Sequence, residues 1–331
     1  KRAQGNHPES IRLAERQVAL KPGLPKPVLG VYRMYQHYLD SANPKKAAVW
    51  LGQHRSAYAG LYLGEALRLA DRASEADSQL TTWLDGGPRV SVIPALLSQA
   101  RMAYADNRPS EGEQRVFAAV ESIGDTVDAA LVFEDTKYVV NEAEMAEYQS
   151  LSEPEAFRLF FRKIWNSRDL MPAKGHNGRL AEHFRRLLYA ERHYLYDGFR
   201  TWFDDPDKLD KLSFPPPFRL NNRFNDIGLV YIRHGEPRDV NKTMRPSESW
   251  LYSETNELPE MTFHFVGTPS AYGFNWQLVE SPEGSGNIGR RLRWDVEKQI
   301  RETHRSVSLG LATDRPTWGR ETEPLDVQAY V

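Results

Sequence analysis

The stretch Gly228–Asp239 reads GLVYIRHGEPRD, and it marks the point where the expected architecture of the chain changes. Its Leu229–Ile232 segment is a short apolar run that ends in a charged turn bounded by Gly235 and Pro237. An uninterrupted apolar run of this length between turn signals is typical of a buried strand. The pattern before it is mostly helical, and short strand-like runs follow it. We therefore predict that 229–232 is the first strand of a mixed domain.

The composition is that of an ordinary globular chain with a weak net charge. Of the 331 residues, 40% are hydrophobic and 27% are charged, which is enough for two domains with separate cores. The formal net charge of -2 offers no basic surface field, so nucleic-acid binding is disfavoured as the main role. No apolar run comes near the roughly 18 residues that a membrane-spanning helix needs, and we expect a soluble protein without a transmembrane segment.

The chain contains no cysteine. This excludes disulfides, thiol catalysis, zinc–thiolate sites, iron–sulfur clusters and covalently attached haem. His176, His183 and His193 lie in or beside one expected helix, but their spacings of 7 and 10 residues do not form the i,i+4 pair of a metal site. We therefore expect no metal site and no cofactor.

A 34-residue repeat organises the first 125 residues. Leu29, Leu63 and Leu97 are spaced by 34, and each opens a segment with the apolar spacing of a helix. A second helix then follows, as at 74–84 and 110–123. This period with two helices per unit resembles that of the tetratricopeptide repeat family, whose hairpins bury their apolar faces by stacking into a solenoid. The residues of the middle unit that match the pattern of this family are Leu63, Gly64, Ala76, Leu80 and Pro88.

The resemblance implies that the first helix of each hairpin lines a concave surface on which a partner protein binds. Polar and aromatic side chains on these helices are the candidates for partner binding, namely Tyr32, Arg33, Gln36, Glu65, Arg68, Gln99 and Arg101. A non-repeating helical bundle is the alternative for this region. Both architectures predict an interaction surface rather than a catalytic site.

Two helices and a short extended segment are expected between residues 128 and 210. Leu131–Phe133 and Tyr138–Val140 are short apolar patches that predict an extended entry to the second domain. Ser152–Glu155 has the residues of a helix N-terminus, and an aromatic stripe follows from Phe157 to Trp165. We interpret this stripe as buried core. A second amphipathic helix is expected over 180–195.

The same region resembles the GWxTD domain, a bacterial family of unassigned biochemistry whose members are commonly exported. The matching residues stand in the order of that family: Ile164, Trp165, Arg168, Asp169, Pro172, Asn177 and Arg186–Ala190. Asp226 and Gly228 align with the Asp and Gly of the name motif, and the match resumes at Gly235, Pro237 and Trp250. Within the name motif, the chain departs from the family at Asn222, Arg223, Asn225 and Ile227. Roles that the family gives to its Trp and Thr therefore do not transfer.

A second resemblance gives the alternative function. Val230–Glu236 reads VYIRHGE and resembles the strand and Arg-His-Gly motif of the histidine phosphatase superfamily. That resemblance implies a phosphoryl hydrolase whose residues would be His234 as nucleophile, Arg233 as phosphate clamp, Glu236 or Asp239 as general acid and His264 as second phosphate ligand. Only 96 residues follow Gly235, and His264 comes only 30 residues after His234. Because a motif depends on its surrounding structure, this context favours the GWxTD resemblance.

Three strand-like runs follow at 250–252, 261–266 and 274–279, with turn signals between them. They predict a small antiparallel sheet. In the middle run, Met261, Phe263 and Phe265 share one face, and Thr262 and His264 share the other. A charged helix over 291–304 and an extended tail are expected after the strands.

These patterns predict a fold that is mainly α with a smaller α+β part. An N-terminal α-solenoid of helical hairpins over 1–127 is followed by an α+β domain with a small antiparallel sheet over 128–290. The charged helix and tail over 291–331 are expected to lead into a further C-terminal domain. We expect a non-enzymatic interaction or scaffold subunit of a bacterial assembly, with protein partners and no catalytic residues. The start at Lys1 rather than Met and the resemblance to an exported family favour an extracytoplasmic location after removal of an N-terminal segment.

Overall fold

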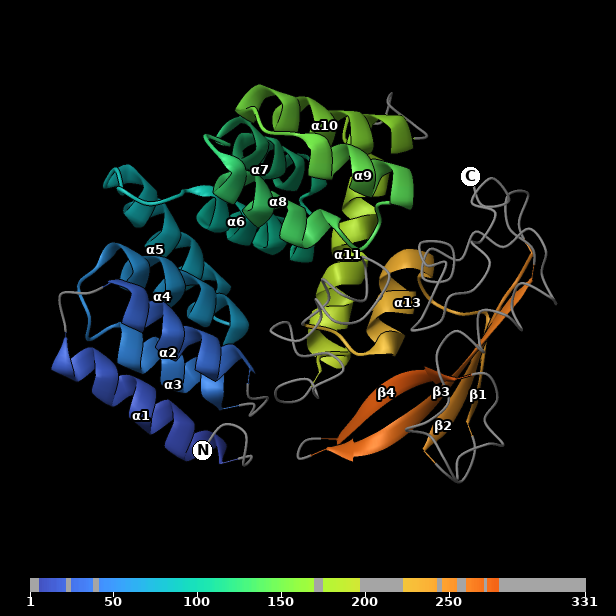
Figure 1. Ribbon diagram of the computed structural model, residues 1–331, viewed down its shortest axis with the longest axis horizontal. Helices are drawn as coiled ribbons and strands as arrows, with labels where there is room; N and C mark the ends of the chain where they lie inside the picture. The colour runs from blue at the N-terminus through green and yellow to red at the C-terminus, as the bar shows by residue number, and fades with distance from the viewer. Residues whose placement is uncertain are drawn as a thin grey trace. The chain divides into compact units, whose positions relative to one another are not determined.

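The computed structural model describes residues 6–21, 25–37, 42–169, 175–196, 223–242, 246–254, 260–270 and 273–279 (Figure 1). It is mainly α with one small antiparallel sheet, which confirms the predicted fold class. The chain divides into two compact units, which are Lys1–Glu134 with Leu151–Arg185, and Asp135–Ser150 with Arg186–Val331. The expected boundary after residue 127 differs from this division, because Leu151–Arg185 groups with the N-terminal helices. The expected helix over 291–304 and the tail lie outside the described residues.

Eight helices of the first half follow one another through short connections among the described residues. They are α1 (His7–Leu20), α2 (Pro25–His37), α3 (Asn43–Leu51), α4 (Ala57–Leu69), α5 (Ala73–Asp85), α6 (Ile93–Ala105), α7 (Pro109–Glu121) and α8 (Thr126–Thr136). The closest neighbours are consecutive in the chain, as in the hairpins α4–α5 and α6–α7. Helix α4 also packs against both α2 and α6, so these three helices form a row.

The hairpins α4–α5 and α6–α7 turn in the same way. Asp71 (φ 59°) and Asn107 (φ 56°) adopt the left-handed conformation, which Asp and Asn tolerate better than other side chains. In each turn, the next backbone amide donates to the carbonyl five residues earlier, from Arg72 to Leu67 at 2.9 Å and from Arg108 to Ala103 at 2.8 Å. The two hairpins therefore end their first helix with the same hydrogen-bonded turn.

Close packing within the α4–α5 hairpin depends on a small residue. A Cβ atom on Gly64 would lie 2.4 Å from Cδ2 of Leu80, whose side chain is fully buried. The Nε1 of Trp83 donates to the carbonyl oxygen of Ala57 at 2.8 Å and so joins the two ends of the hairpin. The missing side chain at Gly64 thus lets α4 approach the Leu80 side chain of α5 closely.

Helix α10 (Pro154–Arg168) belongs to the helical unit and buries the predicted aromatic stripe. The buried residues of α10 are Phe157, Phe160, Phe161, Ile164 and Trp165. Asn177 then caps α11 (Gly178–His193), because its Oδ1 accepts a hydrogen bond from Leu180 N at 2.8 Å. Its Nδ2 donates to the carbonyl oxygen of Trp165 at 2.7 Å, so Asn177 also fixes α11 to α10.

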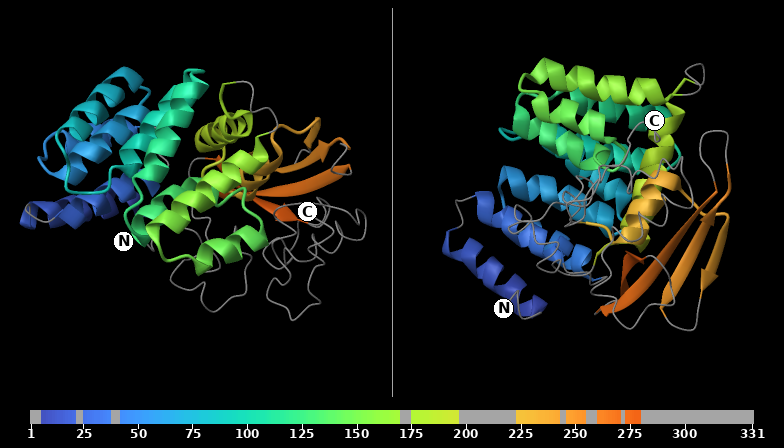
Figure 2. Two further views of the ribbon diagram at one scale, coloured as in Figure 1. Left: turned by 90° about the horizontal axis from the view of Figure 1, so that it is seen from above. Right: turned by 45° about the vertical axis from the view of Figure 1, so that its right-hand side comes forward.

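The second unit contains α9 (Glu142–Ser150), the later part of α11, α13 (Asp226–His234) and the sheet. The strands are β1 (Asp239–Lys242), β2 (Ser247–Tyr252), β3 (Met261–Ser270) and β4 (Gly273–Val279), and they pair antiparallel in the order β1-β2-β3-β4. Figure 2 shows these strands side by side with α13 next to them. The register places Trp250 opposite Phe263 and Phe265 opposite Leu278.

The predicted strands at 250–252, 261–266 and 274–279 lie within β2, β3 and β4 and are confirmed. The predicted faces of β3 are confirmed as well. Met261, Phe263 and Phe265 are at most 2% exposed, whereas Thr262 and His264 are half-buried. Alternation with a period of two is therefore visible in both the sequence and the sheet.

The predicted strand at 229–232 is wrong, because these residues lie in the middle of α13. Asn225 caps this helix by accepting a hydrogen bond from Gly228 N at 3.1 Å, and Gly235 ends it with a positive φ of 82°. The prediction of an extended segment at 131–133 and 138–140 is also wrong, since α8 covers the first patch and a turn begins the second. In α13 continuous burial hides the helical period, whereas α8 alternates buried residues with exposed ones such as Glu134. In both cases a short apolar run alone does not distinguish a helix from a strand.

Candidate protein-interaction site

Polar and aromatic side chains of three neighbouring helices form a connected row in the helical unit. We call Arg33, Tyr62, Glu65, Arg68 and Arg101 the α2–α4–α6 row. The row is continuous, because the charges of Arg33 and Glu65 both act on the Tyr62 hydroxyl and the charge of Arg101 acts on the Glu65 carboxylate. The row therefore brings together side chains as far apart in the sequence as Arg33 and Arg101, because α4 packs against both α2 and α6.

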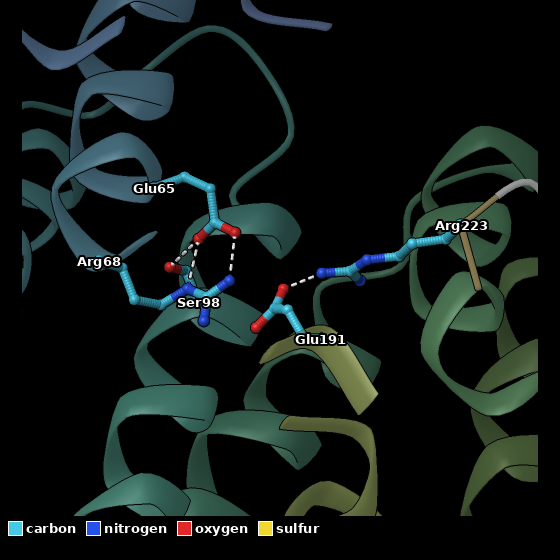
Figure 3. Close-up of polar contacts among 5 residues, drawn as sticks. All are labelled: Glu65, Arg68, Ser98, Glu191 and Arg223. Atoms are coloured by element: carbon cyan, nitrogen blue, oxygen red, sulfur yellow. Dashed lines mark hydrogen bonds and ion pairs between the residues drawn. The ribbon is translucent and has the colours of Figure 1, made fainter. Parts of the chain in front are cut away.

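A largely buried ion pair lies at the centre of this row (Figure 3). Arg68 Nε donates to Glu65 Oε2 at 2.9 Å, and Arg68 Nη2 donates to Glu65 Oε1 at 2.6 Å. From α6, Ser98 Oγ donates to Glu65 Oε2 at 2.5 Å. The side chains of Arg68 and Glu65 are only 8% and 16% exposed. This bidentate geometry makes a strong pair, and the Ser98 hydroxyl links it across to the next hairpin.

The surroundings of Glu65 keep its carboxylate ionised. Burial alone would raise the pKa of Glu65, but the charge and hydrogen bonds of Arg68, the charge of Arg101 and the Ser98 hydroxyl outweigh it. The pKa of Glu65 therefore lies well below its usual range. A carboxylate in this position is charged at neutral pH and holds its arginine partner in one orientation.

Stacked tyrosines continue the row from α4 onto α2. Tyr62 stacks on Tyr32 with ring centroids 4.4 Å apart and an interplanar angle of 20°, and Tyr58 stacks on Tyr62 at 6.1 Å. Burial raises the pKa of Tyr62 to about 12, an effect that the Arg33 charge opposes and that Tyr58 and Glu65 reinforce. The half-buried Tyr62 therefore stays neutral and presents an aromatic edge beside the charged groups.

The structure distributes the predicted partner-binding residues over three environments. Arg33 and Gln36 are exposed on α2, and Arg101 is half-buried on α6. Glu65 and Arg68 bind each other, as described above. Tyr32 and Gln99 are only 3% and 4% exposed, so their side chains are not available to a partner protein in this fold.

The burial of Gln99 has a clear packing cause. Its Nε2 donates to Asp77 Oδ1 at 3.0 Å and to Thr81 Oγ1 at 3.1 Å, so the side chain ties α6 to α5. Tyr32 is buried beneath the ring of Tyr62. Both residues therefore support the row from inside the unit.

Sequence reasoning missed Tyr62 and Ser98 as members of this site. Ser98 follows Glu65 by 33 residues, and Tyr62 follows Tyr32 by 30 residues. The first separation is one residue short of the 34-residue period, and the second is four residues short of it. Neither equals the 34-residue period, so a search for side chains exactly one period apart misses both contacts.

Two open clefts lie on either side of Val49, which is 65% exposed on α3. One has a volume of about 390 Å³, and its lining includes Tyr35 and Trp50. The other has a volume of about 520 Å³ and lies among residues of α3, α4 and α5. Neither lining includes a residue of the α2–α4–α6 row, so the clefts are separate surface features of the same unit.

The Arg-His-Gly motif is used for packing at the end of α13. Arg233 Nη1 donates to the carbonyl oxygen of Tyr138 at 2.8 Å, which holds the turn after α8. Arg186 Nη1 donates to the carbonyl oxygen of Arg233 at 2.7 Å, and a Cβ atom on Gly235 would collide with the Arg186 guanidinium at 2.9 Å. The motif therefore fixes the C-terminal end of α13 against α11 and the 138–140 turn.

The two histidines of the alternative interpretation lie on opposite faces of the sheet. The His234 ring packs against Tyr252 and Phe263, at centroid distances of 5.6 and 5.4 Å. Phe263 and His264 are consecutive residues of β3, so their side chains point to opposite faces. On its own face, His264 Nδ1 lies 2.7 Å from Ser249 Oγ.

The remaining residues of that interpretation do not complete a site either. Burial lowers the pKa of His264, so its imidazole favours the neutral form. Glu236 is exposed in the turn after α13. Arg233, His234, Glu236 and His264 therefore do not converge on one pocket in this fold.

Asn225, Asp226 and Gly228 connect α13 to β4 and to the end of α11. Asp226 Oδ2 accepts a hydrogen bond from Leu278 N at 2.9 Å, and Asn225 N donates to the carbonyl oxygen of Tyr194 at 2.9 Å. A Cβ atom on Gly228 would lie 2.9 Å from Cβ of Tyr194, which explains the need for glycine. Next to this connection, Arg223 and Glu191 form an ion pair (Figure 3).

The described residues bear on two kinds of feature, namely metal-binding groups and membrane-spanning helices. Within the described ranges, no group of three or more His, Asp or Glu side chains is arranged to hold a metal ion. Across the same part of the chain, no helix is both long enough and apolar enough to cross a membrane. Comparisons with protein families, curated proteins and solved structures find no match to this chain.

Proposed function

We propose that this protein is a non-enzymatic interaction or scaffold subunit that binds a partner protein through its N-terminal helices. The observation that carries the proposal is the α2–α4–α6 row, to which three neighbouring helices contribute charged and aromatic side chains. Arginine and tyrosine are, with tryptophan, the residue types most enriched among the side chains that dominate binding at protein interfaces. A surface that several repeats build together also suits an extended partner segment.

The tetratricopeptide-like character of the helical unit is part of this proposal. It is supported by the identical turns at Asp71 and Asn107 and by the contact between Gly64 and Leu80. It is also supported by the contact of Glu65 with Ser98 about one repeat period away. A solenoid of such hairpins would present the α2–α4–α6 row as its binding surface.

The second unit is, in this proposal, a GWxTD-like domain that serves as a structural module. Asp226 and Gly228, the two residues that fit the name motif, join a helix to a neighbouring strand and to α11. Arg233 and His234 are used for packing around α13, which supports a non-enzymatic role. A bacterial, extracytoplasmic assembly is the setting that the resemblance favours.

The proposal is tested by affinity capture from the native source with the full chain. The test variant is Arg33→Glu, which reverses an exposed charge in the row. The control is Arg16→Glu on α1, which reverses the charge of another exposed arginine outside the row. We expect a stoichiometric partner with the wild type and the control, and a loss of that partner with Arg33→Glu. Equal recovery with both variants would exclude the row as the binding surface. Recovery of no partner by the wild type would contradict the interaction role itself.

A further inference from the structure

The hairpin of β3 and β4 extends beyond its neighbouring strand β2. Strand β2 pairs with β3 only up to Val266. Strands β3 and β4 stay paired over four further residue pairs, which join residues 267–270 to residues 273–276. At about 3.4 Å per residue, this two-stranded part is roughly 14 Å long. We call residues 267–270 and 273–276 the hairpin end.

The hairpin end carries the apolar face of the sheet out to an exposed surface. Side chains of a strand alternate between two faces, so Phe274 and Trp276 lie on the same face as Leu278. Leu278 is only 4% exposed, whereas Phe274 is 44% exposed and Trp276 is half-buried. Pro269, directly opposite Phe274, is exposed as well. A face that is core at Leu278 is therefore open to solvent at Phe274.

Contacts within the hairpin hold the two aromatic rings in place. The Phe274 side chain lies across Gly267 of β3, where a Cβ atom would be 3.0 Å from Phe274 Cβ and 3.2 Å from its Cδ1. The ring centroids of Phe274 and Trp276 are 5.8 Å apart. Thr268 Oγ1 donates to the carbonyl oxygen of Asn275 at 3.0 Å and ties the two strands together. The aromatic surface is therefore ordered before it meets a ligand.

The sequence of this hairpin contains no Asp, Glu, Lys or Arg. The span without these residues runs from Met261 to Val279, in a chain of which 27% is charged. The single histidine of the span, His264, favours its neutral form, because burial lowers its pKa. The hairpin therefore has no electrostatic preference for an acidic or a basic ligand, and its surface suits an electrically neutral one.

An aromatic surface without charge suits the boundary between water and an uncharged lipid bilayer. Aromatic side chains such as Trp partition into this boundary, where the ring is shielded and polar groups still meet water. In the described sheet no strand pairs with the outer edges of the hairpin end. Lipid headgroups and water can bond to backbone groups at these edges, whereas the hydrocarbon core cannot. The hairpin end is therefore suited to the headgroup level of a bilayer.

A protein ligand fits this surface less well. Protein interfaces surround their aromatic centre with a polar rim, and arginine is enriched in them. The hairpin end has no charged side chain that could contribute to such a rim. The neutral lipid surface requires none.

We propose that the hairpin end binds an uncharged lipid surface, with Phe274 and Trp276 at the level of the headgroups. The hairpin end belongs to the second unit, so this binding does not depend on the α2–α4–α6 row of the helical unit. Apolar burial drives the binding, which therefore changes little with salt or with anionic lipid. Because only two rings are buried, the attachment is weak and reversible.

The test is sedimentation of the full chain with phosphatidylcholine vesicles at about 50 and about 500 mM NaCl. We expect similar binding at both salt concentrations and little change when phosphatidylglycerol is added. Phe274→Asp should lower the partition coefficient about tenfold, because a charge replaces a ring at the interface. The matched control is Val240→Asp on β1, since Val240 is 43% exposed and lies outside the hairpin end. This control should leave binding unchanged.

A second measurement does not require a new charge in the hairpin. The chain contains no cysteine, so Phe274→Cys and Val240→Cys each provide a single thiol for a nitrobenzoxadiazole label. Emission of the label at position 274 should shift to shorter wavelength with phosphatidylcholine vesicles, and the label at position 240 should not respond. Far-UV circular dichroism of each variant checks that it is folded.

Four results would overturn the proposal. The first is a wild type that does not sediment with phosphatidylcholine vesicles, together with an unshifted label at position 274. The second is binding that needs phosphatidylglycerol and disappears at high salt, and the third is an equal loss in Val240→Asp and Phe274→Asp. The fourth is capture of a protein from the native source that depends on Phe274 while vesicles do not bind, which would assign the surface to a protein instead.

Discussion

The carboxylate of Asp226 accepts a hydrogen bond from the backbone amide of Leu278, 52 residues further along the chain, at 2.9 Å. Asp226 is 1% exposed in the first turn of α13, and Leu278 lies in β4, which is at the edge of the described sheet. The Asp226 side chain therefore accepts a hydrogen bond from a backbone amide of β4 that has no neighbouring strand to pair with in the described sheet. The hydrogen bond links α13 to β4. The negative charge of Asp226 in the first turn also interacts favourably with the dipole of α13.

We predict that Asp226→Ala destabilises the second unit by about 2–3 kcal/mol, because a buried amide loses a charged acceptor. Asp226→Asn keeps an acceptor oxygen at the same position and should cost less. Hydrogen exchange of the β4 amides measures the effect, with faster exchange at Leu278 in the alanine variant. Unchanged exchange at Leu278 in Asp226→Ala would show that the contact contributes nothing to the strand.

A second prediction concerns the packing of α4 on α5. A Cβ atom at position 64 would lie 2.4 Å from Leu80 Cδ2, and the fully buried Leu80 has little space to move. Gly64→Ala should therefore destabilise the helical unit by about 1–3 kcal/mol in urea unfolding. Gly30→Ala is the matched control, since a Cβ atom there meets nothing within 4 Å on the same type of helix. This control should be neutral or stabilise by about 0.5–1 kcal/mol, and equal losses in both variants would contradict the packing argument.

Gly64 and Leu80 also show which part of the fold is readable from the sequence. Both residues belong to the pattern of the middle repeat unit, so a local pattern points to their close packing. The strand at 261–266 was predictable for a similar reason, because its polar face alternates with a buried one. Helix α13 shows the opposite case. All residues from Asp226 to Ile232 are buried, so no polar face reveals the helical period, and only the cap residues Asn225 and Gly235 signal a helix.

The candidate site was predictable only in part. The row contains four predicted residues, Arg33, Glu65, Arg68 and Arg101. The prediction took polar and aromatic side chains from the first helix of each hairpin. The same criterion also predicts Tyr32 and Gln99 as partner-binding residues, and both are buried. Whether such a side chain faces solvent depends on the rotation of its helix against the neighbouring hairpin. That rotation is a tertiary property, and the pattern within one helix does not encode it.

The pH dependence of stability provides a third prediction. The pKa of Glu65 is lower in the folded protein than its ordinary value of 4.5. Its stabilising contribution is therefore present above about pH 4.5 and is lost as the pH falls through the lower folded value. Glu65→Gln leaves Arg68 largely buried without its carboxylate, which should cost about 3–5 kcal/mol at pH 7.

The measurement is the free energy of unfolding of wild type and Glu65→Gln between pH 7 and pH 2. The gap between the two proteins should stay constant from pH 7 to about 4.5 and shrink below that, because protonation makes the wild type resemble the variant. The exposed pair of Arg72 and Glu75 provides the control, since Glu75→Gln should have a much smaller effect at every pH. A gap for Glu65→Gln that persists unchanged at pH 2 would contradict a charged role for this carboxylate.

The last prediction concerns the two histidines of the Arg-His-Gly alternative. His234 contacts Tyr252 and Phe263 on one face of the sheet, while His264 contacts Ser249 on the other, so the two imidazoles do not act on one phosphoryl group. We expect wild type, His234→Ala and His264→Ala to hydrolyse para-nitrophenyl phosphate at the same rate as buffer, with a histidine phosphatase of known activity as positive control. His234→Ala should still lower the free energy of unfolding by about 1–3 kcal/mol, because it removes aromatic packing at the end of α13. Hydrolysis by the wild type that disappears in His234→Ala would restore the phosphatase alternative, and the loss of stability measured on the same sample would show whether unfolding accounts for it.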